Sequence, residues 1–243
     1  MAIGSEIFDA GNSKTFHEGL PVYLRVLLGE EWIKKDLEKE LLLRHPILQW
    51  QNAMIACRGD NIQCPGKANT VSNRGEISAL LNLSYNLYLM AHNSELQEKL
   101  MRRLKDPNQF LGAHYELQVA AFCIQAGFEI TLEDEDDPNS THCEFTATNI
   151  RSGRKYSVEA KARTHGKNSG AISSQLYSAL KKTAEYERII FININTPEKT
   201  SNLEPSKWIH EAIASIRGAE TRLKIKGNDA PPAYVLLTNQ QNA

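Results

Sequence analysis

The sequence predicts an α+β protein in two parts, with an all-helical region over residues 1–108 and an α/β core over residues 109–243. Three patterns support this division. Apolar residues recur at helical spacing in the first part. The run 142–163 alternates with period two and predicts a β-hairpin in the second part. The β-branched run 188–194, RIIFINI, predicts a buried strand.

The composition is that of an ordinary soluble globular protein, with 41% hydrophobic and 23% charged residues. No apolar run approaches the roughly 18–20 residues of a membrane span, and the first residues, MAIGSEIFDAGNSK, lack the apolar core of a secretory signal. Four scattered cysteines favour free thiols and a cytoplasmic location. A net charge of −1 excludes a globally basic nucleic-acid binder. The sequence contains no Gly-rich phosphate loop, so a nucleotide cofactor is not indicated.

The first part is expected to contain several helices, each with apolar residues three or four positions apart. They span residues 30–43, 46–57, 74–90 and 94–104. Residues 58–73 contain Gly59, Pro65 and Gly66, which predicts a loop. This part is expected to recognise a substrate, to form a homodimer or to act as a scaffold for the core.

The second part is expected to run helix, three strands, helix, strand, followed by a further helix and strand. In chain order these are residues 112–126, 128–132, the two hairpin strands, 171–187, 188–194, 205–217 and 234–237. Gly127 separates the first of these helices from the strand that follows it.

The hairpin places three charged side chains on one strand face. Its first strand alternates Glu144, Thr146, Thr148 with Phe145, Ala147, Asn149. Its second strand alternates Lys155, Ser157, Glu159, Lys161 with Tyr156, Val158, Ala160, Ala162. A turn centred on Ser152 and Gly153 is expected to join the strands. Glu144 then lies opposite Lys161 and diagonal to Glu159, with the two glutamate Cβ atoms roughly 7–8 Å apart.

Two carboxylates at this separation can bind one divalent cation. Mg²⁺ takes hard oxygen ligands and usually combines one or two protein carboxylates with phosphate oxygens of a substrate. Lys161, two residues after Glu159, can then orient or deprotonate a metal-bound water. An ordinary ion pair between Glu144 and Lys161 on a solvated strand face is the alternative.

The second part resembles the PD-(D/E)XK, or restriction-endonuclease-like, nuclease superfamily. The motif of that family is an acidic residue on one strand and an acidic-x-Lys triplet on the next. Glu159-Ala160-Lys161 matches the triplet, and Glu144 stands where the family usually has Asp. The expected element order is the family's α-β-β-β-α-β. The resemblance implies a mixed central sheet flanked by helices, and a nuclease that requires Mg²⁺, for which Mn²⁺ can substitute.

The resemblance also implies a third carboxylate on the first core helix, where Glu116 fits. It would join Glu144 and Glu159 as a metal ligand. The apolar arc of this helix consists of Ala113, Leu117, Ala120, Ala121 and Ile124, and Glu116 is placed on its rim. A glutamate that is solvated or paired with a nearby base is the alternative.

Some branches of the family use a glutamine on the helix after the triplet to contact the site or the nucleic-acid backbone. Gln175 occupies such a position and shares one helical stripe with Ser178 and Lys182. A glutamine on the helix surface without a role is the alternative.

The implied function is hydrolysis of phosphodiester bonds, with DNA as the expected substrate. Basic residues crowd the hairpin turn and follow the triplet, which suits a ligand held mainly through its phosphates. They are Arg151, Arg154, Lys155, Lys161, Arg163, His165 and Lys167. The family's usual Pro-Asp pair is absent, so a catalytically inactive member of the fold that binds DNA or a protein partner is the alternative.

Overall fold

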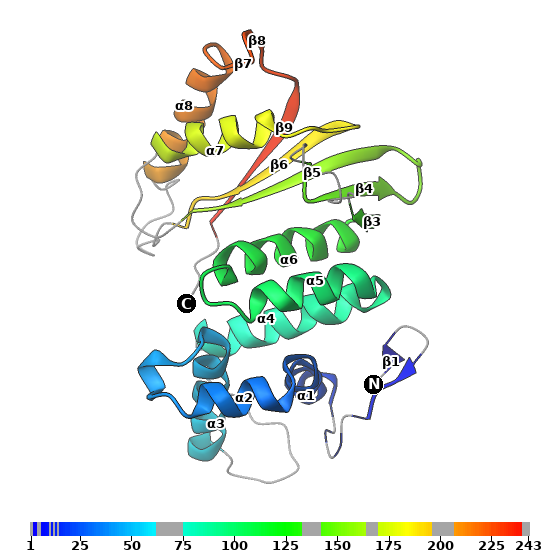
Figure 1. The fold of residues 1–243 in the computed structure, drawn as a ribbon, viewed down its shortest axis with the longest axis vertical. Coiled ribbons are helices and arrows are strands. Elements are labelled where there is room, and N and C mark those ends of the chain that lie inside the picture. The colour runs from blue at the N-terminus through cyan, green and yellow to red at the C-terminus, as the bar shows by residue number, and fades with distance from the viewer. Residues whose placement is uncertain are drawn as a thin grey trace. The chain divides into compact units, whose positions relative to one another are not determined.

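The computed structural model describes residues 2–3, 6–9, 11, 13, 15–61, 75–132, 142–163, 170–195 and 207–239. The chain divides into two compact units, residues 1–117 and 118–242 (Figure 1). The boundary falls inside the helix α6 (Phe110–Gln125), later in the chain than the predicted boundary at residue 108. None of the helices within the described ranges has the length and apolar character needed to cross a bilayer.

The first unit is mainly helical in the ranges that the structure describes. The expectation of an all-helical region is wrong, because two short strands near its start pair in antiparallel fashion. Its elements are β1 (Ala2–Ile3), β2 (Glu6–Ile7), α1 (Phe16–Leu28), α2 (Glu30–Leu37), η1 (Leu41–Leu43), α3 (Pro46–Asn61), α4 (Gly75–Leu89), η2 (Met90–His92), α5 (Ser94–Leu104) and the first half of α6. The start of the predicted loop 58–73 continues α3, and residues 62–73 lie outside the described residues.

Two helices of this unit differ from those expected from the sequence. α1 was not predicted, although Thr15 and Glu18 form the capping box that begins it. The predicted helix 30–43 ends early, because the Asp36 carboxylate accepts a hydrogen bond from the His45 amide at 2.7 Å and turns the chain back. Both features depend on side chain to backbone bonds that apolar periodicity does not report.

The first unit has a core of its own. The ring centroid of Phe110 lies 5.7 Å from that of Trp50 and 5.4 Å from that of His114, on which it stacks. The buried Gln97 amide donates to the Tyr23 hydroxyl at 2.8 Å. Such pairing is required where polar groups are removed from water.

The second unit is built on a five-stranded mixed sheet in the order β3-β4-β5-β6-β9. β3, β4 and β5 are antiparallel, whereas β6 and β9 run parallel to β5. The elements of this unit are β3 (Phe128–Leu132), β4 (Phe145–Asn149), β5 (Lys155–Ala162), α7 (Gly170–Lys181), β6 (Glu187–Asn193), α8 (Lys207–Glu220), β7 (Lys224–Ile225), β8 (Asn228–Asp229) and β9 (Ala233–Thr238). The mixed α+β fold class is confirmed, and the short strands β7 and β8 were not expected. The assignment to a restriction-endonuclease-like core stays a prediction.

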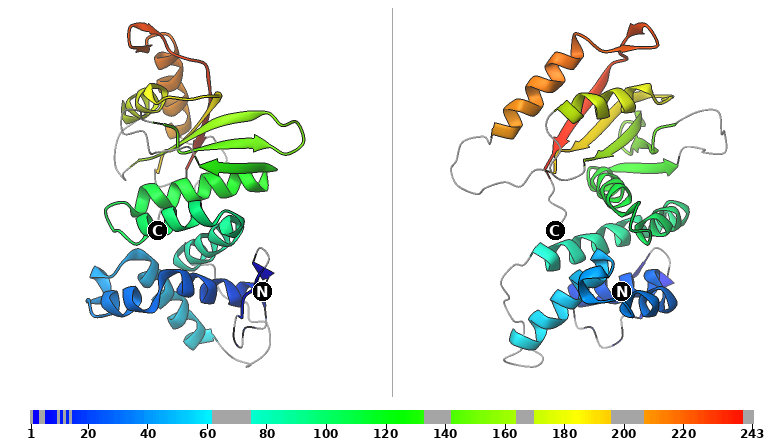
Figure 2. Two further views of the ribbon diagram at one scale, coloured as in Figure 1. Left: turned by 45° about the vertical axis from the view of Figure 1, so that its right-hand side comes forward. Right: turned by 60° about the vertical axis from the view of Figure 1, so that its left-hand side comes forward.

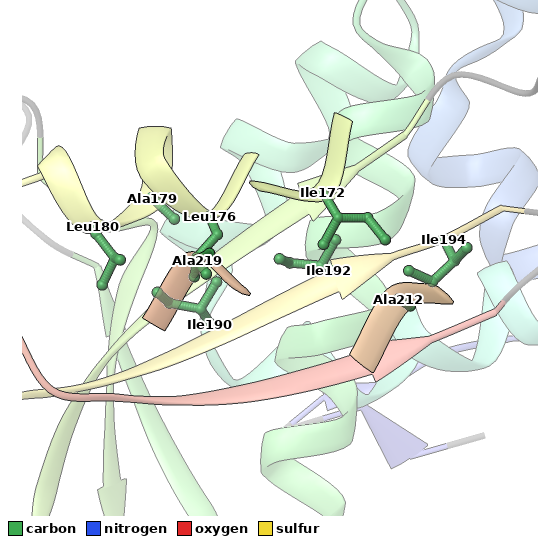
Figure 3. Close-up of a cluster of buried hydrophobic side chains, with 9 residues drawn as sticks. All are labelled: Ile172, Leu176, Ala179, Leu180, Ile190, Ile192, Ile194, Ala212 and Ala219. Carbon is green, nitrogen blue, oxygen red and sulfur yellow. The ribbon is translucent and has the colours of Figure 1, made fainter. Parts of the chain in front are cut away.

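Helices cover both faces of this sheet (Figures 1 and 2). α7 and α8 lie on one face, where they enclose a cluster of buried apolar side chains (Figure 3). The cluster consists of Ile172, Leu176, Ala179, Leu180, Ile190, Ile192, Ile194, Ala212 and Ala219. On the opposite face the second half of α6 packs, with the ring of Phe122 5.8 Å from that of Phe191. A sheet covered on both sides excludes water from most of its central strands.

α7 ends at Lys181, six residues before the end that the sequence predicted. Thr183 forms a parallel β-bridge with His142, and the Arg188 guanidinium donates to the Lys182 carbonyl at 3.3 Å. These contacts, the first of them with a segment distant in the sequence, end the helix at Lys181, although the pattern of residues 182–187 is helical.

The hairpin register differs from the predicted one by two residues. Phe145 pairs with Val158, and Thr148 pairs with Lys155. Since a shift of two residues keeps every side chain on its face, the predicted alternation still holds. The predicted pairing of Glu144 with Lys161 is wrong.

The turn explains this shift. The Asn149 side chain accepts hydrogen bonds from the amides of Arg151 at 3.2 Å and Ser152 at 2.9 Å. This Asx turn widens the connection to residues 150–153, and the Asn149 amide donates to the Arg154 carbonyl at 2.8 Å. Gly153 completes the turn with a φ of +68°.

We expect Gly153→Ala to destabilise the second unit by about 1–2 kcal/mol, because the left-handed backbone is unfavourable for a residue with a Cβ atom. No atom of the described residues beyond its chain neighbours lies within 4 Å of the added Cβ, so the cost is conformational. Gly112→Ala, in the helix α6, is the control and is expected to be neutral or stabilising. Urea unfolding measures both, and equal stability of the two variants would contradict the prediction.

Candidate active site

Glu144 lies immediately before β4, beside the middle of β5. Its amide donates to the Val158 carbonyl at 3.0 Å, although Phe145 is the residue that pairs with Val158. Two residues therefore lie against one, which is the pattern of a β-bulge. Bulges re-aim side chains at the ends of strands and occur often next to functional sites. The register, continued by one residue from Phe145 and Val158, places Glu144 opposite Glu159.

One ammonium group links the two strand glutamates. Lys182 Nζ lies 3.1 Å from Glu144 Oε1 and 3.0 Å from Glu159 Oε1. Lys161 Nζ lies 2.5 Å from the same oxygen of Glu159. The two carboxylates therefore converge on one point, as the prediction of a shared cation requires. We call these four residues the Glu-Lys cluster.

The cluster is not a solvated strand face. The Glu159 side chain is 1% exposed, and that of Glu144 is 15% exposed. The alternative of an exposed pair between Glu144 and Lys161 is therefore wrong in its burial and in its partners. The parallel neighbour of Glu159 on β6 is Ile190, a member of the apolar cluster under α7 and α8.

Burial raises the pKa of the Glu159 carboxyl, and the negative charge of Glu144 raises it further. The ammonium groups of Lys161 and Lys182 only partly offset these effects. Within the described part of the chain Glu159 Oε2 has no hydrogen-bond partner. An additional cation at the cluster would stabilise this buried charge. The donor set, two carboxylates with hard oxygens, is also the kind that Mg²⁺ takes in proteins.

Lys182 is the site residue that sequence reasoning missed. It shares a helical stripe with Gln175, but it was placed inside a helix that in fact ends at Lys181. Burial lowers the pKa of the Lys182 ammonium, yet the charges of Glu144 and Glu159 raise it by more, so this pKa lies above its usual value. The shared stripe with Gln175 was the available signal.

Gln175 lies next to the end of β5. Its side-chain amide donates to the Ala162 carbonyl at 3.2 Å, one residue after Lys161. Its Oε1 atom is buried and has no hydrogen-bond partner among the described residues. Gln175 therefore supports the backbone that carries Lys161, and its contact with a ligand stays a prediction.

Glu116 belongs to the first unit. It is buried on α6, and the Arg103 guanidinium donates to its Oε2 atom. Glu116 and the strand glutamates belong to different units, so its role as a third ligand stays a prediction. Among the described residues no group of three or more His, Cys, Asp or Glu side chains is placed to hold a metal ion.

We expect Glu159→Gln to raise the melting temperature of the metal-free protein at neutral pH. A raised carboxyl pKa means that the folded state binds the proton more tightly than the unfolded state, so the charged form of Glu159 lowers stability. The advantage of the variant should shrink as the pH falls through the folded-state pKa toward the ordinary value of 4.5. Thermal unfolding in EDTA tests this, with the exposed Glu129→Gln as control. A variant that is less stable than the native protein at neutral pH would contradict the prediction.

No protein-family model, curated protein or solved structure matches this chain. The function of the Glu-Lys cluster is therefore inferred from its geometry and chemistry.

Proposed function

We propose that this chain is a nuclease that requires Mg²⁺ or Mn²⁺ and hydrolyses phosphodiester bonds, with a restriction-endonuclease-like core in its second part. The single observation that carries the proposal is the convergence of Glu144 and Glu159 on one cationic group beside Lys161. The order of α6, β3, β4, β5, α7 and β6, with the triplet on the third of these strands, supports the same family.

Each member of the site has a role that fits its position. Glu144 and Glu159 hold the cation through carboxylate oxygens. A bound divalent cation supplies charge stabilisation for the phosphate and lowers the pKa of water. Lys161 is one fifth exposed, so its ammonium can reach both Glu159 and a ligand at the surface. It positions the attacking water and neutralises charge on the phosphate.

The proposed substrate is a nucleic acid, with DNA as the first choice, and its phosphates suit the exposed hairpin turn. This turn lies at the end of β4 and β5 opposite to Glu144 and Glu159. Arg151, Arg154 and Lys155 are exposed there, and Arg154 Nη2 lies 2.5 Å from Glu187 Oε2. His165 and Lys167 of the predicted basic rim lie outside the described residues. Contacts of basic side chains with phosphates fix the position of a nucleic acid without reading its sequence.

One observation favours a second candidate function, an inactive member of the same fold that binds DNA or a protein partner. Two carboxylates and two ammonium groups already balance each other within the Glu-Lys cluster. Such a cluster can stabilise the fold as an ion-pair network without any bound cation. Calorimetry with Mn²⁺ separates the two functions, since the inactive module is expected neither to bind the ion nor to cleave nucleic acid.

We expect Glu159→Ala and Lys161→Ala each to reduce metal-dependent cleavage of plasmid and single-stranded DNA by at least about 10²-fold, the usual size of a lost acid–base or charge-stabilising group. Circular dichroism should show that both variants remain folded. Glu129→Ala and Lys181→Ala remove the same charges at exposed positions of β3 and α7 and serve as matched controls. Full activity of either purified site variant would refute the assignment.

A further inference from the structure

The Lys182 ammonium contacts both strand glutamates, at the position where a cation shared by them would bind. Within the described ranges it is the one residue whose ion pairs reach both carboxylates, with distances of 3.1 Å to Glu144 and 3.0 Å to Glu159. Lys161 pairs with Glu159 alone in the same ranges. The two lysines of the Glu-Lys cluster are therefore not equivalent.

The backbone from this lysine onward is held by neighbouring segments of the second unit. The Lys182 carbonyl accepts from Arg188 on β6, and Thr183 forms a bridge with His142, two residues before Glu144. The amide of Tyr186 donates to Ser157 Oγ at 3.2 Å. These bonds fix the start of the Lys182 side chain beside the glutamates, whereas its four-carbon stem remains free to redirect the ammonium group. The side chain is 21% exposed, so part of it already contacts solvent.

We propose that Lys182 is an internal counter-cation: its ammonium occupies the place between Glu144 and Glu159 in the metal-free protein and leaves it when a divalent cation binds. This inference rests on the proposed function. The oxygen atoms that Lys182 contacts are the ones that a shared cation needs. An ammonium and a divalent cation cannot both occupy that place, because they repel each other and compete for the same lone pairs.

The exchange also changes the charge of the cluster. Two carboxylates and two ammonium groups sum to zero, and a divalent cation leaves a surplus of two positive charges. A displaced Lys182 ammonium at the rim of the site is then available to a phosphodiester anion, which lysine binds as a point charge. The exchange thus couples cation binding to substrate binding.

The test compares Mn²⁺ binding by three forms of the full chain after EDTA treatment and dialysis. They are the native protein, Lys182→Met and Lys181→Met. Isothermal titration calorimetry is expected to show Mn²⁺ binding to Lys182→Met about tenfold more tightly than to the native protein, because the competing charge is gone. Lys181 is exposed at the end of α7, so Lys181→Met should bind Mn²⁺ like the native protein.

Thermal unfolding supplies a second readout that is independent of cleavage. Without metal, Lys182→Met should melt below the native protein, since two carboxylates then face each other without their shared partner. Saturating Mn²⁺ should raise its melting temperature by more than it raises that of the native protein. Lys182→Gln, which can still donate to both carboxylates, replaces the methionine variant if the latter does not fold.

The outcomes separate this inference from the proposed function. If the native protein binds Mn²⁺ and neither Lys182 variant binds it more tightly, the counter-cation role is overturned and the nuclease proposal stands. If the native protein and the variants all fail to bind Mn²⁺ and the native protein cleaves no nucleic acid, both proposals are overturned.

Discussion

The burial of the Glu159 charge is the constraint on which the candidate site depends. Glu159 lies in the middle of a sheet whose two faces are covered by helices, and its neighbour on β6 is the apolar Ile190. A carboxylate removed from water must be compensated by opposite charge or hydrogen bonds. Lys161 from the same strand and Lys182 from the end of α7 supply that charge. Lys182, just after α7, and Glu159 therefore contribute to one arrangement of charges.

Most of the fold follows from periodicity in the sequence. The bounds of β3 and α5 were predicted without error, and Glu159 and Lys161 lie on one face of β5 as expected. The features that were predicted wrongly have a common cause. They are set by hydrogen bonds that the apolar pattern does not contain. The Asn149 side chain sets the hairpin register, and the bridge between Thr183 and His142 ends α7. Apolar spacing describes which face a residue occupies, but it contains no information on such bonds.

The strand residues of the candidate site could be predicted from the sequence, whereas the role of Lys182, just after α7, could not. Period-two alternation places Glu159 and Lys161 on one face whatever the register, since a shift by two positions preserves the face. The position of Glu144 opposite Glu159 depends on the observed register, which apolar spacing does not specify. Lys182 enters the cluster because α7 stops one residue before it, which is a tertiary effect. A carboxylate on a covered face of a sheet nevertheless requires a basic partner. The helical stripe that Gln175 shares with Lys182 indicated such a partner.

The ion pairs of Lys182 have a consequence for how the protein matures. A site made of two buried carboxylates alone would have to wait for an ion from the surroundings before its strands could close around it. Here the compensating charge is covalently part of the polypeptide and arrives with the turn that follows α7. The charge of Glu159 is therefore compensated within the chain itself, and under the proposed function the binding of a cation would follow folding.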